Sequence, residues 1–347
     1  MKLKNITYAI ITFIGLVFLE LIGAYIYENY KSIEVSENIS ENLKVHFIDV
    51  GQGDSIFIEL PDLKTVLIDA GENIYGEKVT NYIKKLRYKK IDYLFATHPH
   101  SDHIGGLESI IDNFDVGSIY MPEVTSNSTL YLNLLKKIDN KNKKIKIAIA
   151  SKNVILTDDL NLKILAPSGK TYEDINNYSI VLKLTYKEKS FLFMSDASYD
   201  SEMDLLNSKF NLKADVLKVG HHGSTSSTNY NFLNAVDPKI AIISVGENND
   251  YGHPKEKILN KLKNKNIKIY RTDLNGNIVV TTNGKMIRMK VDYGSNSWSY
   301  WRRISCFRAT FFKAYKCTKN FNSKCFRRWY NRYKYQLSKK KRKRNRS

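Results

Sequence analysis

The stretch Thr97-His98-Pro99-His100-Ser101-Asp102-His103-Ile104-Gly105-Gly106 decides the fold, because it gathers metal-binding side chains on one turn. It holds three of the seven histidines of the chain. The apolar run at residues 91–96 predicts a buried strand before it, and residues 107–114 have the apolar spacing of a helix after it. Gly105 and Gly106 remove side chains where we expect the backbone to pass close to the site. A strand-to-helix turn of this composition predicts a metal site.

The spacing within this turn separates its ligands into two pairs. Residues two apart in an extended segment point the same way, so His98 and His100 can offer imidazole nitrogens to one ion. Asp102 and His103 lie where the chain turns into the helix, so they face elsewhere and suit a second ion, as in two-metal hydrolases. The competing interpretation is a polar surface turn that binds no ion.

Apolar segments on both sides of this turn alternate between strand and helix patterns. Strands are expected at residues 43–50, 55–60, 64–69, 117–121, 144–150, 179–186, 190–194, 216–219 and 239–245. A helix is expected at residues 129–138, and Pro254 is expected to begin another that runs to about Lys265. Such alternation around two sheets predicts an α/β fold, a four-layer αββα sandwich.

The pattern HxHxDH at residues 98–103 resembles the metal-binding motif of the metallo-β-lactamase superfamily. Four further segments narrow the resemblance to the extracellular hydrolase domain of ComEC-type competence DNA-uptake proteins: Asp49-Val50-Gly51-Gln52-Gly53-Asp54-Ser55, Leu67-Ile68-Asp69-Ala70-Gly71, Leu217-Lys218-Val219-Gly220-His221-His222-Gly223-Ser224 and Tyr251-Gly252-His253-Pro254. The resemblance covers about residues 43–290. It implies the same αββα fold and two divalent metal ions, Zn²⁺ or Mn²⁺.

The resemblance also implies two ligand sets that share one carboxylate. The first ion would be held by His98, His100 and Asp196, and the second by Asp102, His103, Asp196 and His253. Asp69 would hold the histidine loop in place. The glycines and hydroxyls around His221 and His222 indicate that one of the pair, with His222 preferred over His221, acts as a ligand or as the general acid for the leaving group. Asp102, His222 and Asp69 are thus the expected catalytic residues. From the residues alone, Asp196 also suits a helix N-cap and Asp69 a turn cap.

One ligand common in the superfamily has no counterpart in this sequence. Many members place a further histidine between the HxHxDH turn and the bridging aspartate, and here no histidine lies between His103 and Asp196. Asn176, Asn177, Ser179 or water would have to fill that position of the first ion. Weaker binding, or binding of a harder ion, would follow, which makes Mn²⁺ a competitor of Zn²⁺.

The basic character of the chain is confined to its end. The formal net charge is +20, but residues 298–347 contain 18 Lys and Arg and no acidic residue, so the remainder is close to neutral. All three cysteines also lie there, and no disulfide framework holds the main domain. Residues 293–347 are expected to be a basic aromatic tail, either a nucleic-acid-binding arm or a frame-shifted end.

The beginning of the chain predicts a membrane anchor. Residues 6–27 are apolar apart from Glu20, and as a helix they would span about 33 Å, enough to cross a bilayer. Lys2 and Lys4 precede this run and acidic residues follow it, so residues 1–5 are expected inside the cell and the rest outside. Residues 28–42 are expected to be a polar spacer before the domain at 43–292. A cleaved signal peptide, and hence secretion, is the alternative.

These features together predict an extracellular, membrane-anchored hydrolase with two metal ions. The resemblance favours DNA as the substrate, which would make the protein a phosphodiesterase or DNase. Another envelope phosphodiester, a lactone or an amide remains an alternative within enzymes. A protein that has lost its metal and only binds nucleic acid is the alternative outside them.

Overall fold

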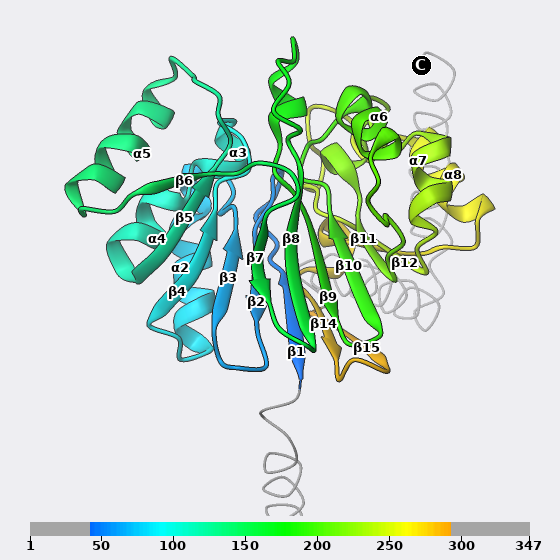
Figure 1. Ribbon diagram of the computed structural model, residues 1–347, viewed down its shortest axis with the longest axis horizontal. Helices are drawn as coiled ribbons and strands as arrows, with labels where there is room; N and C mark the ends of the chain where they lie inside the picture. Colours follow the sequence, from blue (N-terminus) through cyan, green and yellow to red (C-terminus); the bar gives the residue numbers. More distant parts are fainter. Residues whose placement is uncertain (1–41, 293–347) are drawn as a thin grey trace, which may run out of the picture. The chain divides into compact units, whose positions relative to one another are not determined.

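Two β-sheets form the centre of the computed structural model, which describes residues 42–292 (Figure 1). The first sheet has eight strands in the order β15 (Ile287–Val291), β14 (Ile278–Thr282), β1 (Leu43–Phe47), β2 (Ile56–Glu59), β3 (Thr65–Ile68), β4 (Lys90–Phe95), β5 (Asp115–Met121) and β6 (Ile145–Ile147). The second has seven in the order β13 (Lys268–Arg271), β12 (Ile240–Ile243), β11 (Val216–Lys218), β10 (Lys189–Phe193), β9 (Val181–Tyr186), β8 (Leu160–Ala166) and β7 (Asn153–Leu156). Both sheets are mixed.

Helices lie between the strands along the chain. They are α2 (Gly76–Lys85), α3 (Ser101–Ile104), α4 (Leu107–Asn113), α5 (Thr129–Asn140), α6 (Tyr199–Asn207), α7 (Tyr230–Val236), α8 (Glu256–Asn264) and α9 (Thr272–Asn275). Three short 3₁₀ segments are η1 (Asn73–Tyr75), η2 (Ile175–Tyr178) and η3 (Gly220–Gly223). The expected helices at residues 107–114 and 129–138 are thus confirmed as α4 and α5.

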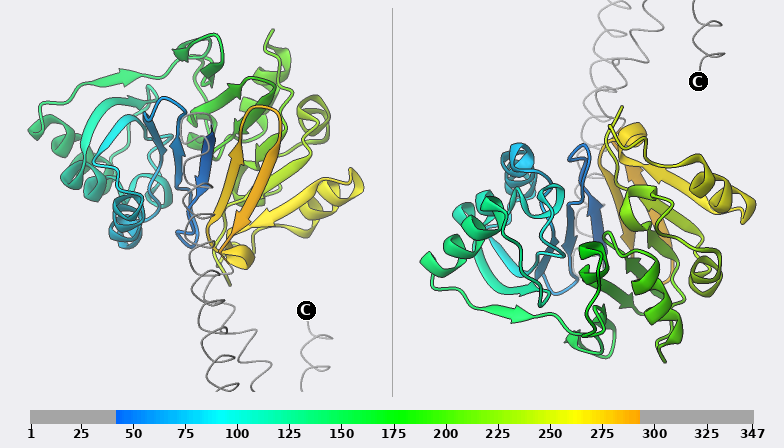
Figure 2. Two further views of the ribbon diagram at one scale, coloured as in Figure 1. Left: turned by 90° about the horizontal axis from the view of Figure 1, so that it is seen from below. Right: turned by 90° about the horizontal axis from the view of Figure 1, so that it is seen from above.

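Three apolar cores explain why these elements stack in layers. One core lies between the two sheets, and in it Phe47 and Phe95 of the first sheet pack with Phe191 and Phe193 of the second. A second core joins the first sheet to α2, α4 and α5, and a third joins the second sheet to α6, α7 and α8. Figures 1 and 2 show the helices on the outer faces of the sheets. The layered α/β fold predicted from the sequence is confirmed.

Strands from the beginning and the end of residues 42–292 are neighbours in the first sheet. Strand β14 pairs antiparallel with β1, so residues far apart in sequence lie side by side, as the orange hairpin and blue strand of Figure 2 show. In the hairpin β14–β15, Thr282 pairs with Ile287, so residues 283–286 connect the two strands, and the Asn283 side chain accepts from the backbone N–H of Lys285 at 3.0 Å. Within residues 42–292 no helix has the length and apolar character needed to cross a membrane. The expected anchor at residues 6–27 and the tail at 293–347 lie outside the described residues.

The start of α8 differs from the expectation. The helix begins at Glu256 with Lys255 as its N-cap, so Pro254 precedes the helix. Pro254 packs instead on the glycine-rich segment η3, where a Cβ added to Gly223 would lie 2.6 Å from its Cβ. That contact brings the loop holding His253 against the loop holding His221 and His222.

Candidate metal centre

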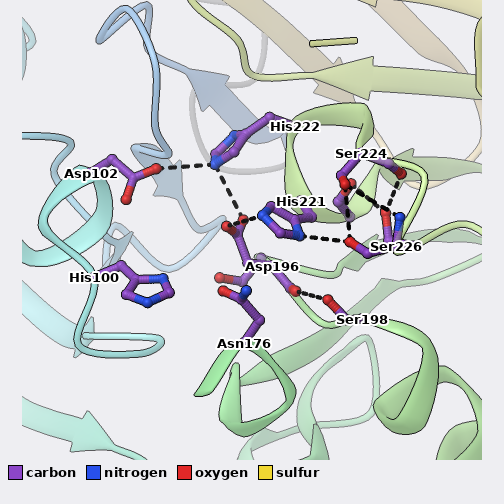
Figure 3. Close-up of polar contacts among 12 residues, drawn as sticks. His100, Asp102, Asn176, Asp196, Ser198, His221, His222, Ser224 and Ser226 are labelled. Carbon is purple, nitrogen blue, oxygen red and sulfur yellow. Dashed lines mark hydrogen bonds and ion pairs between the residues drawn. The ribbon is translucent and has the colours of Figure 1, made fainter. Parts of the chain in front are cut away.

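The candidate ligands lie on loops at one edge of both sheets. Carboxyl ends of parallel strands share an edge, and open α/β sheets bind ligands there. Asp69 follows β3, the histidine loop (residues 97–106) follows β4, Asp196 follows β10, and residues 221–222 follow β11. Figure 3 shows His221 and His222 directed at Asp196, and Asp102 directed at His222. The site therefore forms only where the two sheets meet.

Three groups of side chains in the described residues could hold an ion, and two of them share Asp196. The larger of these two consists of Asp102, His103, Asp196 and His222. His222 Nε2 lies 3.3 Å from both Asp102 Oδ2 and Asp196 Oδ1, and His103 Nε2 lies 3.3 Å from Asp196 Oδ1 and 3.7 Å from Asp102 Oδ2. Tetrahedral ligands at bond lengths of 2.0–2.2 Å from an ion lie about 3.3–3.6 Å apart. The spacing therefore matches the edges of a coordination sphere.

Buried atoms without hydrogen-bond partners give an independent test of whether this group of residues suits a metal ion. His103 Nε2, Asp196 Oδ1 and His222 Nε2 are all buried and have no hydrogen-bond partner. Leaving one buried polar atom unpaired costs about 1–3 kcal/mol, so three that converge on one point require a common partner. A cation at that point satisfies all three, so the residues fit a metal ion.

The smaller group consists of His98, His100 and Asp196. His98 Nε2 lies 3.0 Å from His100 Nδ1 and 4.0 Å from Asp196 Oδ2. Asp196 thus presents Oδ1 to the larger group and Oδ2 to the smaller one. Two groups that share one carboxylate are consistent with a binuclear metal site.

Hydrogen bonds outside the groups fix the orientation of the imidazoles. Asp69 accepts from His103 Nδ1 at 2.8 Å, and it also accepts from the backbone N–H and the hydroxyl of Thr97 at 2.9 and 2.6 Å. His222 Nδ1 donates to the carbonyl of Ser244 at 2.9 Å. In both imidazoles the Nε2 atom is thereby left to face the ligand group, as metal-binding histidines require.

Close backbone contacts hold the histidine loop against its neighbours. A Cβ on Gly106 would lie 2.3 Å from the carbonyl oxygen of Ala70, and one on Gly53 would lie 2.1 Å from that of Asp102. No other residue fits at these two positions without displacing the backbone. The expected close approach at Gly106 is therefore present.

Strained backbone occurs repeatedly around the site. Asp69, Ser195, His221 and His222 have φ values of 55°, 47°, 47° and 51°, in the left-handed region. This region costs a residue with a side chain about 1–2 kcal/mol, and such strain concentrates at functional sites. The left-handed pair directs His221 Nε2 to within 3.6 Å of Asp196 Oδ2 while His222 Nε2 lies against Oδ1. The left-handed backbone thus places the imidazoles of two successive residues next to the Asp196 carboxylate.

The charges of the larger group stabilise one another. Burial disfavours ionised Asp196, but His222 and His103 outweigh it and hold the pKa of Asp196 well below its usual range. Burial likewise lowers the pKa of His222, but Asp196 and Asp102 raise it to about 10. The pKa of His103 is raised by the same carboxylates against its burial. A cation that binds here replaces protons on the imidazoles.

His253 lies outside both ligand groups of the described residues, although the sequence placed it among the ligands of the second ion. Its ring centroid is 5.8 Å from that of His221, its Nδ1 atom is buried without a partner, and burial together with His222 lowers its pKa to about 4. The exposed ring of Tyr251 stacks on it at 5.7 Å. The geometry favours His222 as the ligand, because the left-handed turn directs its Nε2 inward, and leaves His253 at the rim.

One buried ion pair has no role in the sequence-based prediction. Lys218 Nζ lies 2.7 Å from Asp54 Oδ2, and both side chains are almost completely buried. Asp54 Oδ1 lies 3.5 Å from His222 Nδ1. The available signal was a lysine within the apolar run of residues 216–219, since a buried lysine requires a partner.

The fold and the site define a class of layered α/β proteins with two imidazole–carboxylate groups at the edge where the two sheets meet. The chain belongs to the metallo-beta-lactamase superfamily, whose family profile matches residues 48–247. Among curated proteins it is similar to ComE operon protein 3 of Bacillus subtilis (strain 168). The two are 34% identical over 257 residues, which cover 69% of this chain and 33% of that protein.

Other relatives extend the same relationship. Competence protein ComA of Neisseria gonorrhoeae is 28% identical over 253 residues, covering 72% of this chain and 33% of that protein. The chain therefore spans about a third of the length of these two relatives. Among solved structures, Igni18, a metallo hydrolase from Ignicoccus hospitalis, aligns with a TM-score of 0.45 and 15% identity over 69% of this chain and 98% of that one. The sequence comparisons show distant homology to competence proteins.

Proposed function

We propose that this protein is a metal-dependent hydrolase that cleaves phosphodiester bonds of DNA. The observation that carries the proposal is the larger ligand group, whose four side chains have the spacing of a coordination sphere and three buried unpaired atoms. We assign Asp102, His103, Asp196 and His222 to one ion and His98, His100 and Asp196 to the other. His253 is left out of both sets.

Two bound divalent ions would supply an activated water and charge stabilisation at the phosphoryl group. The chain's own part is to hold the ligands and move protons. Asp69 and the Ser244 carbonyl fix the imidazoles of His103 and His222. His221 keeps about a quarter of its side chain exposed, with Nε2 next to Asp196 and Nδ1 bonded to Ser226. We therefore assign proton transfer to the leaving group to His221 Nε2, because His222 Nε2 is enclosed by carboxylates. Burial lowers the pKa of His221, so its imidazole has to take up a proton from solvent before it can donate one.

The similarity to other proteins and the side chains at the rim of the site both support a nucleic-acid substrate. One of the relatives that share this domain, ComA of Neisseria gonorrhoeae, is a competence protein by name. The rim of the site carries the exposed Tyr251 ring, supported from behind by His253. Aromatic rings of this kind stack on bases of single-stranded nucleic acid. The hydroxyls of Ser224 and Ser226 next to His221 suit an anionic backbone.

We further propose that the domain works outside the cell, tethered by residues 6–27. The support is the sequence alone: an apolar run long enough to cross a bilayer, with Lys2 and Lys4 before it and acidic residues after it. Protease treatment of intact cells that express a C-terminally tagged chain tests this. Removal of the domain without lysis is the expected result, and protection of the domain contradicts it.

The catalytic proposal is tested on the full-length protein, solubilised in detergent and loaded in turn with Zn²⁺ and Mn²⁺. We expect two ions per chain and cleavage of single-stranded DNA and bis-p-nitrophenyl phosphate, both lost in Asp196→Asn. Lactone and amide substrates are measured in parallel. Hydrolysis of only a lactone or amide would replace the phosphodiesterase assignment, and a chain that binds DNA but no metal would refute the enzyme.

A further inference from the structure

The smaller ligand group is incomplete as it stands. It contains three protein side chains, His98, His100 and Asp196, whereas the larger group contains four. Divalent ions at imidazole–carboxylate sites take at least four ligands. A further donor must come from water or from a residue beside Asp196.

The segment that packs beside Asp196 is η2 with the residue that follows it. Three of its polar side chains are those that the sequence left open as ligands, namely Asn176, Asn177 and Ser179, and two of these three are already engaged. Asn177 Oδ1 accepts from the backbone N–H groups of Ser198 and Ser201 at 3.2 and 3.1 Å, and Ser179 Oγ accepts from the backbone N–H of Asp196 at 3.2 Å. Both side chains therefore hold the Asp196 turn in shape and have their acceptor oxygens occupied.

Asn176 is the third polar side chain, and its oxygen is unused. The residue is 9% exposed, and Oδ1 is buried without a hydrogen-bond partner. Figure 3 shows its side chain pointing towards Asp196, on the side where His100 lies. The backbone is fixed in this position, because Asp174 Oδ1 accepts from the Asn176 N–H at 2.9 Å. A buried amide oxygen without a partner costs about 1–3 kcal/mol, which binding to a cation would recover.

We propose that Asn176 Oδ1 is a ligand of the first ion, together with His98, His100 and Asp196. The inference rests on the proposed metal centre and specifies the chemistry of one of its halves. An amide oxygen is a harder ligand than an imidazole nitrogen, so it shifts the preference of this site from Zn²⁺ towards Mn²⁺. The two halves of the centre therefore differ in metal preference.

Metal titration of the full-length protein tests the assignment without any substrate. The ion-free protein is titrated with Mn²⁺ by calorimetry, and bound Mn²⁺ is followed by electron paramagnetic resonance. In Asn176→Ala we expect one ion to bind as in the native protein and the other about tenfold or more weakly. Asn161→Ala is the matched control, because Asn161 Oδ1 is also buried without a partner but belongs to neither ligand group. Unchanged binding of both ions by Asn176→Ala overturns the inference.

Two further variants keep the test decisive if Asn176→Ala does not fold. Asn176→Asp retains an oxygen donor and should bind Mn²⁺ at least as tightly as the native protein. Asn176→His replaces oxygen by imidazole nitrogen and should raise the Zn²⁺-to-Mn²⁺ affinity ratio of one site about tenfold or more, and an unchanged ratio contradicts the inference. A native protein that binds no ion refutes the metal centre itself. Two ions that bind independently of residue 176 refute only the role of Asn176.

Discussion

Lys218 and Asp54 form an ion pair of 2.7 Å between Nζ and Oδ2, with 0% and 1% of their side chains exposed. The pair lies behind the metal centre: Asp54 Oδ1 is 3.5 Å from His222 Nδ1, and the Asp54 N–H donates to the Asp102 carbonyl at 3.1 Å. Asp54 thereby connects the two loops that carry Asp102 and His222. The Lys218 ammonium thus pairs with that carboxylate where water reaches neither group.

Replacing Lys218 by methionine should destabilise the protein by about 3–5 kcal/mol, because it leaves the Asp54 charge buried and unpaired. The double variant Lys218→Met/Asp54→Leu removes both charges and should recover a large part of that loss. Urea unfolding of the native protein, of the single variants Lys218→Met and Asp54→Leu, and of the double variant measures the coupling free energy between the two side chains. Equal stability of Lys218→Met and the native protein would contradict the prediction.

Asp69→Asn should weaken metal binding about 10–100-fold, because it alters the acceptor that orients His103 and the Thr97 backbone. Asp92→Asn is a close control. Asp92 also accepts from the backbone N–H and the hydroxyl of a threonine, Thr65, yet it belongs to neither ligand group. Competition with a chelator gives both affinities, and an equal loss in the two variants would show that Asp69 acts only on the fold.

Glu59 should make stability depend on pH in the acid range. Burial disfavours its charge, but His46, at 2.8 Å, and Lys44 lower its pKa from 4.5 to about 2. The folded state therefore binds the proton more weakly, so the stabilisation is present above about pH 5 and is lost as the pH falls towards 2.

Glu59→Gln should consequently unfold more easily at pH 7, by at most about 3 kcal/mol, and the difference should vanish near pH 2. Glu77→Gln, at an exposed position of α2, is expected to match the native protein throughout. A difference between Glu59→Gln and the native protein that persists unchanged down to pH 2 would rule out this linkage.

Tyr251→Ala should raise the KM for single-stranded DNA at least about fivefold, since stacking on one base contributes about 1–3 kcal/mol. The turnover number should stay within about twofold, because the ring lies at the rim and outside both ligand groups. Tyr230→Ala removes another tyrosine of similar exposure, 61% against 64%, and should leave KM unchanged. Equal KM values for the two variants would exclude the stacking role of Tyr251.

The sequence predicted the parts of the fold and site that depend on local order along the chain. Apolar spacing located α4 and α5, and the cluster at residues 98–103 located the histidine loop. The roles of His222 and His253 depend on the backbone instead, since the left-handed turn at His221 and His222 directs the second imidazole inward. Neither φ value can be inferred from the residue types, because histidine seldom adopts this conformation.

The pairing of Lys218 with Asp54 escaped prediction for a different reason. Lys218 ends strand β11 of the second sheet, whereas Asp54 lies in the loop between β1 and β2 of the first, far away in sequence. Only the packing of one sheet on the other brings them together. The sequence could not show which of Asn176, Asn177 and Ser179 is a metal ligand, because that also depends on contacts in the folded chain. Their hydrogen bonds in the folded chain distinguish them.

The distribution of the ligands along the chain bears on how the protein is made. The histidine loop leaves the ribosome first, whereas Asp196 and His222 emerge only after roughly a hundred further residues, in segments that follow strands of the other sheet. A nascent or prematurely terminated product therefore carries imidazoles but lacks the shared carboxylate. The proposed metal centre can therefore assemble only after synthesis has passed His222, and fragments that end before Asp196 are expected to be inert.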